Sequence, residues 1–242
     1  MEGEQKLVYL VTGGTGFIGA YVVRNLLEAG EEVVCFQRSG ITPLFQEVVS
    51  KEHLVKVKVV QGSVADTLDL FDTVCKYKVD SIIHLAYVLY PYSEVPPLAL
   101  RINVIGSNNV FEAARLFGVR RVVWTSTFGV FGRLGQFYGD KVVFEKDVVY
   151  RPTRLYGATK ALVEFLTNQY NEQFGVDIIG LRCARIYGIG KLSGGGMEFT
   201  QLLRQAALDQ PVTIGGGDER WVYGHVEDVA QAILKACTVS ST

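Results

Sequence analysis

The feature that most constrains the fold is a regular alternation of short apolar runs with amphipathic stretches. The apolar runs have the length of strands and lie at residues 6–12, 32–36, 55–60, 79–84, 121–125 and 178–181. Stretches with apolar residues at helical spacing lie between them, at 16–29, 68–77, 98–117 and 156–174. Because the runs are continuously apolar, they indicate parallel strands that are covered on both faces. The order predicts an α/β protein with a Rossmann-type doubly wound parallel sheet, whose ligands bind at the carboxyl ends of the strands.

A glycine motif follows the first apolar run and opens the first helix. It reads Thr12-Gly13-Gly14-Thr15-Gly16-Phe17-Ile18-Gly19. Gly13 permits a sharp turn, Gly16 lets the backbone approach a pyrophosphate, and Gly19 lets the helix pack closely on the strand. The helix N-terminus adds free N–H groups and a partial positive charge. The motif therefore predicts a dinucleotide-binding loop.

A second motif, Tyr156-Gly157-Ala158-Thr159-Lys160, opens the helix expected at 156–174. Tyr156 and Lys160 are four residues apart and share one face of that helix. The ordinary pKa of tyrosine lies near 10, and a neighbouring ammonium lowers it by stabilising the phenolate. Hydride transfer at a carbon that bears oxygen requires a proton partner at that oxygen. The pair therefore indicates a hydride-transfer site, where Lys160 can also hold the nicotinamide ribose.

Composition and charge exclude several classes of partner. The 242 residues carry a formal net charge of −1, which gives no electrostatic case for nucleic acid or an anionic membrane surface. No apolar run approaches the roughly 20 residues of a membrane span, and the acidic, polar N-terminus differs from a signal peptide. The four cysteines are scattered without a Cys-x-x-Cys pair, as expected of free thiols in a reducing cytoplasm. We expect a cytoplasmic protein with a small-molecule substrate and no metal site.

The glycine motif resembles that of the short-chain dehydrogenase/reductase superfamily, in its extended branch of sugar-nucleotide epimerases, dehydratases and 3β-hydroxysteroid dehydrogenases. The resemblance extends from about residue 7 to about residue 235. The further matching strings are His84-Leu85-Ala86, Asn103-Val104-Ile105-Gly106-Ser107-Asn108, Leu181-Arg182, Tyr187-Gly188 and His225-Val226-Glu227-Asp228-Val229-Ala230. The resemblance implies an NAD(P)-dependent dehydrogenase or reductase. A nucleotide-sugar epimerase is the alternative within enzymes, and a non-catalytic NADP-binding sensor or structural subunit is the alternative outside them.

The same resemblance implies roles for single residues. Tyr156 corresponds to the acid/base and Lys160 to its partner. When Val130-Phe131-Gly132 is aligned with the family's Val-Tyr-Gly, Thr127 becomes the hydroxyl that binds the substrate oxygen, with Ser126 as the alternative. Asn103 corresponds to a residue that organises the site.

Other positions depart from the family pattern or stay open. Phe128-Gly129 replaces the Asp-Glu pair of the dehydratases, so we expect neither water elimination nor decarboxylation. Arg220 is offset by one residue from an arginine that contacts a diphosphate in relatives, and it is equally interpretable as a loop cation. His84 and His225 are interpreted as structural.

The end of the second strand bears on cofactor choice. It reads Gln37-Arg38-Ser39, without the carboxylate that would accept a hydrogen bond from the ribose 2′-OH. Arg38 and Ser39 can bind a 2′-phosphate, which favours NADP over NAD. Ser63 replaces an aspartate that meets the adenine amine in relatives. The residues expected to contact the cofactor are Gly13, Thr15, Gly16, Phe17, Ile18, Gly19, Arg38, Ser39, Ser63, Val64, Leu85, Ala86, Asn103, Thr125, Tyr156 and Lys160.

The alternation weakens after residue 187, which suggests a division of the chain. We expect 1–187 to form the dinucleotide-binding domain and 188–242 a partial substrate-binding region. In that region the sequence indicates a helix at 197–208, a short strand at 212–214 and a final helix at 226–237, with the last two packing back on the Rossmann core. Extended relatives continue for several tens of residues beyond such a helix, so the substrate-binding part is small, whether as a natural short form, a fragment or a chain completed by a partner. The resemblance also implies a homodimer through the helices at 98–117 and 156–174.

Overall fold

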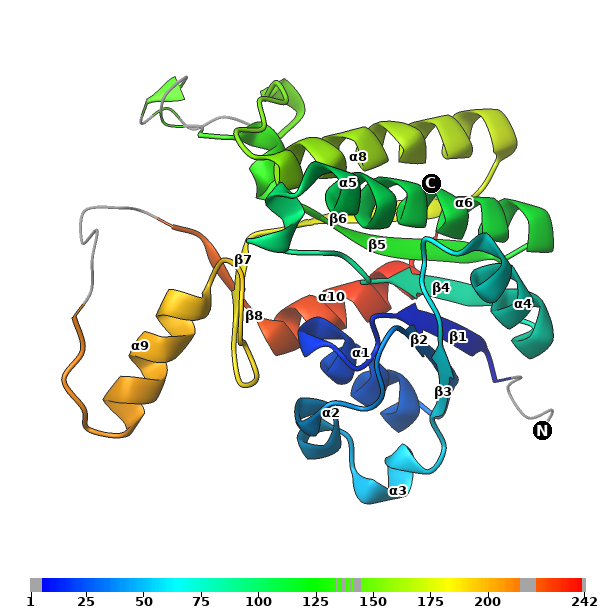
Figure 1. Cartoon of the computed structure of the whole chain (residues 1–242), viewed down its shortest axis with the longest axis horizontal. Coiled ribbons are helices and arrows are strands. Elements are labelled where there is room, and N and C mark those ends of the chain that lie inside the picture. Colours follow the sequence, from blue (N-terminus) through cyan, green and yellow to red (C-terminus); the bar gives the residue numbers. More distant parts are fainter. Residues whose placement is uncertain are drawn as a thin grey trace.

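Six parallel strands form one sheet in the computed structural model, which describes residues 6–133, 135, 138–139, 141, 145–213 and 221–240. The order across the sheet is β3-β2-β1-β4-β5-β6 (Figure 1). The strands are β1 Val8–Thr12, β2 Glu32–Gln37, β3 Lys58–Gln61, β4 Ser81–His84, β5 Arg121–Thr127 and β6 Ile178–Cys183. Strand order reverses between β1 and β4, and this reversal creates the crevice in which such sheets bind ligands. The predicted doubly wound Rossmann-type fold is confirmed.

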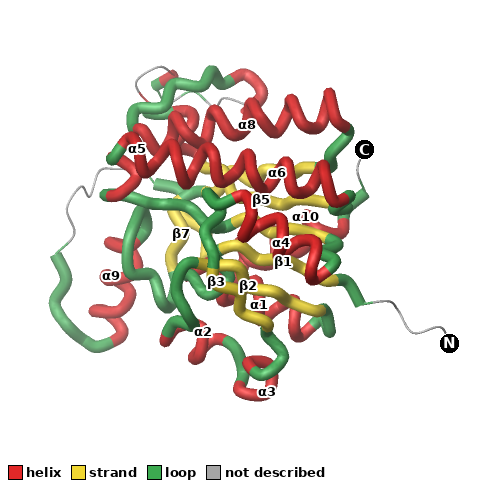
Figure 2. Tube along the Cα trace, turned by 45° about the vertical axis from the view of Figure 1, so that its right-hand side comes forward, coloured by secondary structure: helices red, strands yellow, loops and turns green. Residues whose placement is uncertain are grey.

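Helices cover both faces of the sheet, as the continuous apolar strands require. One face packs on α1 Phe17–Glu28, α2 Pro43–Val48 and α10 Val226–Thr238, and the other on α4 Thr67–Tyr77, α6 Gly106–Phe117 and α8 Leu155–Phe174 (Figure 2). Neighbouring strand residues alternate between the two cores. Leu10 belongs to the core under α4, α6 and α8, whereas Val11 belongs to the core under α1 and α10. The strands β1, β2, β4 and β5 are therefore buried on both sides, whereas the edge strand β3 is mostly exposed.

Several elements differ in detail from the sequence-based expectation. The helix expected at 98–117 begins earlier and is composite, because α5 Pro96–Ala99, the π-helical η2 Leu100–Ile105 and α6 follow one another directly. The strand expected at 55–60 begins at Lys58, because a short helix, α3 Lys51–Leu54, precedes it and is capped by Ser50. Helix α2 was not expected, although Pro43 at its first turn is a typical start signal.

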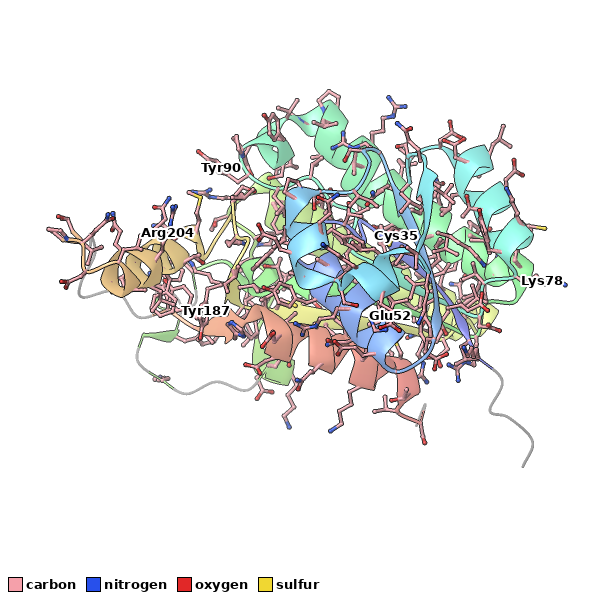
Figure 3. The ribbon with its side chains drawn as sticks, turned by 90° about the horizontal axis from the view of Figure 1, so that it is seen from below. Cys35, Glu52, Lys78, Tyr90, Tyr187 and Arg204 are labelled. Carbon is pink, nitrogen blue, oxygen red and sulfur yellow. The ribbon has the colours of Figure 1, made fainter. Side chains whose placement is uncertain are left out.

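The elements between β6 and α10 extend beyond the carboxyl ends of the sheet strands. It contains β7 Arg185–Tyr187 and β8 Tyr223–His225, which pair in parallel, and the helix α9 Met197–Ala207, which buries none of its residues. Figure 3 shows Tyr187, Arg204 and Tyr90 toward the same end of the molecule, away from Lys78 at the amino ends of the strands. The strand expected at 212–214 is not found at 212–213, and Ile214 lies outside the described residues.

The remaining elements are short. They are the 3₁₀-helices η1 Tyr92–Glu94, η3 Phe128–Phe131 and η4 Glu145–Asp147. In the described part of the chain no helix has the length and hydropathy of a membrane span.

A buried arginine ties the start of β5 to the end of α10. Arg121 donates from Nε and Nη2 to Oδ2 of Asp177, at 2.8 and 2.7 Å. Its Nη1 donates to the carbonyl oxygens of Ala236 and Val239, at 2.9 and 2.6 Å. These carbonyls belong to the last turn of α10 and the residue that follows it, so Arg121 satisfies groups that a helix end leaves unpaired. The guanidinium thereby fixes α10 against the sheet.

We predict that Arg121→Met lowers the free energy of unfolding by about 3–5 kcal/mol, because it removes the buried guanidinium and its hydrogen bonds to Asp177 and to the carbonyl oxygens of Ala236 and Val239. The control is Lys58→Met, which breaks a half-exposed pair with Glu32 and should change the same quantity by less than about 1 kcal/mol. Urea denaturation of both variants measures the difference. Equal effects of the two substitutions would contradict this role of Arg121.

Candidate active site

A cavity of about 500 Å³ opens at the carboxyl ends of β1, β2 and β4. We call it the cofactor cavity, because the predicted cofactor residues of the glycine loop and of the loops after β2, β3 and β4 all line it. These residues are Gly13, Thr15, Gly16, Phe17, Ile18, Gly19, Arg38, Ser39, Ser63, Val64, Leu85 and Ala86. Segments that are far apart in the sequence thus meet around one space at the strand reversal.

The glycine loop has the geometry that its sequence indicates. Gly13 has φ +69, and a Cβ there would meet the backbone of Leu85 and Ala86 at 3.1 Å. A Cβ on Gly19 would collide with the carbonyl oxygen of Gly13, so only glycine lets α1 pack this closely on the loop. Gly16 precedes α1, which has no side-chain cap and no acidic residue in its first turn. The first N–H groups of α1 are therefore available to an anion.

Gln37 fixes the loop from the end of β2. Its Oε1 accepts hydrogen bonds from the N–H of Thr15, at 3.0 Å, and from the hydroxyl of the same residue. Its Nε2 donates to the carbonyl oxygen of Gly40 at 2.9 Å. The side chain that replaces the expected carboxylate is thus buried and fully engaged in holding the glycine loop.

The charge of the cofactor cavity suits a dinucleotide. Its described lining includes no aspartate or glutamate, and it includes the cations Arg38 and Lys191. A cavity with this charge, an uncapped helix N-terminus and a glycine loop fits a ligand that carries a diphosphate.

Lys160 lies beside this cavity, completely buried. Its Nζ donates to the carbonyl oxygen of Thr125 at 2.5 Å. The same atom lies 2.7 Å from the ring centroid of Tyr87, which lines the cofactor cavity, and 5.7 Å from that of Tyr156. Burial lowers the pKa of Lys160, and the neighbouring Cys183 and Glu164 act in the opposite direction. Burial also raises the pKa of Tyr156, with a further contribution from Cys183.

The two candidate hydroxyls at the end of β5 point in different directions, as alternation along a strand requires. Ser126 is buried and donates to Glu164. Thr127 is partly exposed, and its Oγ1 accepts the N–H of Gly129 at 3.1 Å. A Cβ on Gly157 would meet the carbonyl oxygen of Gly129 at 2.5 Å, so this turn packs directly on the start of α8, next to Tyr156.

Glu164 is the centre of a polar network behind the site. It accepts hydrogen bonds from Ser126, from the hydroxyl of Tyr150, and from Nε and Nη2 of Arg182, the last at 3.0 and 2.7 Å. Burial raises the pKa of Glu164, but the hydrogen bonds from Arg182, Ser126 and Tyr150 outweigh it and hold the pKa below its usual range. Arg182 also pairs with Glu145. The network joins β5, β6 and α8 to the loop that follows η3.

Two buried polar residues fix the loop after β4. Nδ1 of His84 lies 2.7 Å from the Thr12 hydroxyl, and its Nε2 lies 3.1 Å from the Ser107 hydroxyl. Burial lowers the pKa of His84 well below its ordinary value, with a further contribution from Lys160, so the ring is neutral. Asn103 accepts the N–H of Val88 at 2.9 Å and donates to its carbonyl oxygen at 3.1 Å. Both side chains position the loop and do not line the cofactor cavity.

Sequence reasoning missed several residues of this region. Tyr87, Lys191 and the neighbours of Lys191 line the cofactor cavity, and Cys183 pairs in register with Thr127. The strand register was the signal available for Cys183, and the glycines at 188 and 190 were the signal available for Lys191. Thr125, expected to contact the cofactor, accepts a hydrogen bond from Lys160 through its carbonyl oxygen and is not part of the described lining of the cofactor cavity. Arg220 and Gly215-Gly216-Gly217 lie outside the described residues.

The described residues hold no group of three or more His, Cys, Asp or Glu suited to a metal ion.

Fold and cavity together are those of a Rossmann-type dinucleotide-binding protein. Residues 9–241 match the model of the NAD dependent epimerase/dehydratase family, and the chain belongs to that family. Its chemistry is accordingly that of an NAD(P)-dependent oxidoreductase or epimerase of the extended short-chain type.

Individual relatives agree with this assignment. UDP-glucose 4-epimerase of Mycolicibacterium smegmatis is 31% identical over 94% of this chain and 72% of its own length. Human 3 beta-hydroxysteroid dehydrogenase type 7 is 35% identical over 77% of this chain and 52% of its own. The crystal structure of Thermus thermophilus UDP-glucose 4-epimerase in complex with NAD is 27% identical, with a TM-score of 0.81 over 97% of this chain and 76% of that one.

Proposed function

We propose that this enzyme transfers a hydride between NAD(P) and a small or sugar-like substrate that carries a hydroxyl or carbonyl group. One arrangement carries the proposal. Lys160 contacts the ring of Tyr87, which lines the cofactor cavity, and Tyr156 lies one helical turn from Lys160 on α8. A proton-transfer pair therefore adjoins the cavity in which the cofactor would bind. Residues 1–187 would contribute most of the cofactor side of the site, and 188–242 the substrate side, apart from residues 190–193, which line the cofactor cavity.

Tyr156 is the acid/base of this proposal. Because burial raises the pKa of Tyr156, the phenol is protonated at neutral pH and can donate a proton to a carbonyl oxygen that becomes a hydroxyl. In the opposite direction the phenolate must form, and the ammonium of Lys160 stabilises it. Thr127 donates a hydrogen bond to the same substrate oxygen. Ser126 is the weaker candidate, because its hydroxyl is already bonded to Glu164.

The cofactor, when bound, supplies the hydride acceptor or donor. The residues of the glycine loop would hold its diphosphate, and Ser63 and Val64 would face its adenine. We propose a preference for NADP, because Arg38 and Ser39 lie exposed at the edge of the cavity. In the described part of the chain no carboxylate pairs with the Arg38 guanidinium, which is therefore available to a 2′-phosphate.

Nucleotide-sugar epimerisation is the second candidate, favoured by the similarity to the epimerase of Mycolicibacterium smegmatis over 94% of the chain. The same tyrosine and lysine would then serve an oxidation and a re-reduction at one carbon. Net NADPH consumption with a panel of carbonyl compounds supports reduction. Turnover of a UDP-sugar with no net change in cofactor supports epimerisation. Phe128 and Gly129 provide no acid or base for water elimination in either case.

We predict that Tyr156→Phe lowers kcat by about 10²–10⁴-fold, because it removes the proton donor and leaves the ring in place. Cofactor affinity, followed by fluorescence titration, should remain that of the wild type. Tyr90→Phe, at an exposed tyrosine, is the matched control and should retain full activity. Full turnover by the Tyr156→Phe variant would refute the proposed acid/base.

We predict that Arg38→Ala weakens NADPH binding by about tenfold or more while changing NADH binding little, because only NADPH carries the 2′-phosphate. Isothermal titration calorimetry with both cofactors measures the ratio. Lys51→Ala, on α3, is the control for a general loss of positive charge. Tighter binding of NADH than of NADPH by the wild type would overturn the preference.

We further propose a homodimer built on α6 and α8, which lie side by side along the outside of the sheet (Figure 1). Leu162 and Phe165 on α8 are 44% and 61% exposed, and Ile105, just before α6, is 50% exposed. Exposed apolar side chains on two adjacent helices are typical of a subunit interface.

Four free cysteines support our further assignment to the reducing cytoplasm, and a disulfide in the native protein would contradict it.

We expect Leu162→Glu to convert the dimer into a monomer in sedimentation velocity, because it places a charge in the buried centre of the interface. Leu203→Glu, at a similarly exposed leucine of α9, should leave the dimer intact. A wild-type protein that sediments only as a monomer would exclude the homodimer.

A further inference from the structure

The segment between β7 and α9 returns to the cofactor cavity. In Figure 1 this loop runs from β7 toward α1 and α2. The hydroxyl of Tyr21, on α1, donates to the carbonyl oxygen of Ile189 at 3.1 Å. Gly190 packs on Leu44 of α2 so closely that a Cβ there would collide with it. The next three residues, Lys191, Leu192 and Ser193, line the cavity. The segment thus borders the cavity next to α1 and α2.

Glycine allows this path. Gly188 and Gly190 have φ +141 and φ +90, conformations that other residues rarely adopt. The N–H of Lys191 donates to the carbonyl oxygen of Gly188 at 3.3 Å, which closes a tight turn. The turn directs the Lys191 side chain toward the start of α1, where its Nζ lies 5.0 Å from the ring centroid of Phe17.

Lys191 is a partly buried cation for which no described carboxylate forms an ion pair. Glu198, the acidic residue that influences it, pairs with Arg185. Burial lowers the pKa of Lys191, which is the usual effect of removing an ammonium from water without a counter-ion. The ammonium lies near Phe17, the first residue of the uncapped helix α1, and both residues line a cavity with no described carboxylate in its lining. Two sources of positive charge therefore converge on the same space, and each is left without an anion by the protein.

We propose that Lys191 binds the diphosphate of the dinucleotide, and that the segment 188–193 covers the cofactor next to α1 and α2. This inference rests on the proposed location of the dinucleotide in the cofactor cavity. The diphosphate supplies the anion that both the α1 N-terminus and Lys191 lack. Lys191 acts on phosphate groups that NAD and NADP share, so it contributes affinity without choosing between them. Arg38, at the other end of the cavity, would make that choice.

Calorimetry with ADP and adenosine tests this inference, because the two ligands differ only in the diphosphate. We expect Lys191→Met to weaken ADP binding by about tenfold to a hundredfold and to leave adenosine binding unchanged. Lys191→Arg should restore most of the ADP affinity. Lys76→Met, at an exposed lysine of α4, should bind ADP as the wild type does. Equal ADP affinity in the wild type and Lys191→Met, or an equal loss for adenosine, would overturn the proposal.

A labelling experiment on the wild type gives the same answer without a variant. Reductive methylation followed by mass spectrometry measures how fast each lysine reacts. ADP should protect Lys191 and adenosine should not, with Lys76 as the unprotected reference. Protection of Lys191 by both ligands, or by neither, would contradict contact with the diphosphate.

These measurements separate the inference from the proposed function, since none of them uses Tyr156 or turnover. If Lys191→Met loses ADP binding while Tyr156→Phe keeps full turnover, the acid/base assignment of Tyr156 is refuted and the role of Lys191 is supported. If ADP and NADP do not compete for the wild-type protein, the proposed location of the dinucleotide is refuted, and the role of Lys191 is refuted with it.

Discussion

A buried ammonium lies where β5, α8 and the loop after β4 meet. Burial of an unpaired charge is costly, and Lys160 has no carboxylate within ion-pair distance in the described part of the chain. It is stabilised instead by the carbonyl oxygen of Thr125 and by the face of the Tyr87 ring. These partners come from different elements, so the position of the ammonium requires that all of them be correctly assembled. The geometry of the active site therefore depends on how this one charge is held.

Two titratable side chains near that ammonium are held by partners of their own. His84 is neutral, because burial and Lys160 together lower its pKa, and it serves as a link between Thr12 and Ser107. Glu164, one turn beyond Lys160 on α8, is neutralised mainly by Arg182. The Glu164 carboxylate thus links Ser126 of β5 to Tyr150 and Arg182. Its ion pair is separate from Lys160, the cation to which we assign the role beside Tyr156.

The sequence was sufficient for the sheet and the glycine loop, because both follow from local patterns. Continuous apolar runs specify buried parallel strands, and the spacing of Gly13, Gly16 and Gly19 specifies the turn into α1. The composite helix over 96–117 depends on a π-helical turn, and the late start of β3 depends on the capped helix before it. Neither was predictable in detail from the sequence. Tyr87 and Lys191 were missed for a different reason: they reach the cavity through loops whose paths depend on tertiary contacts. Strand alternation alone, in contrast, separates Ser126 from Thr127.

The most direct test of this account is the pH dependence of kcat for alcohol oxidation at saturating cofactor, in the wild type and in Lys160→Met. In the proposed mechanism, oxidation requires the phenolate of Tyr156, and a cationic Lys160 lowers the pH at which that phenolate forms. The account predicts that the midpoint of the profile moves upward by about one pH unit or more in Lys160→Met. A profile with the same midpoint in both proteins would contradict it, because Lys160 would then carry no charge that acts on Tyr156.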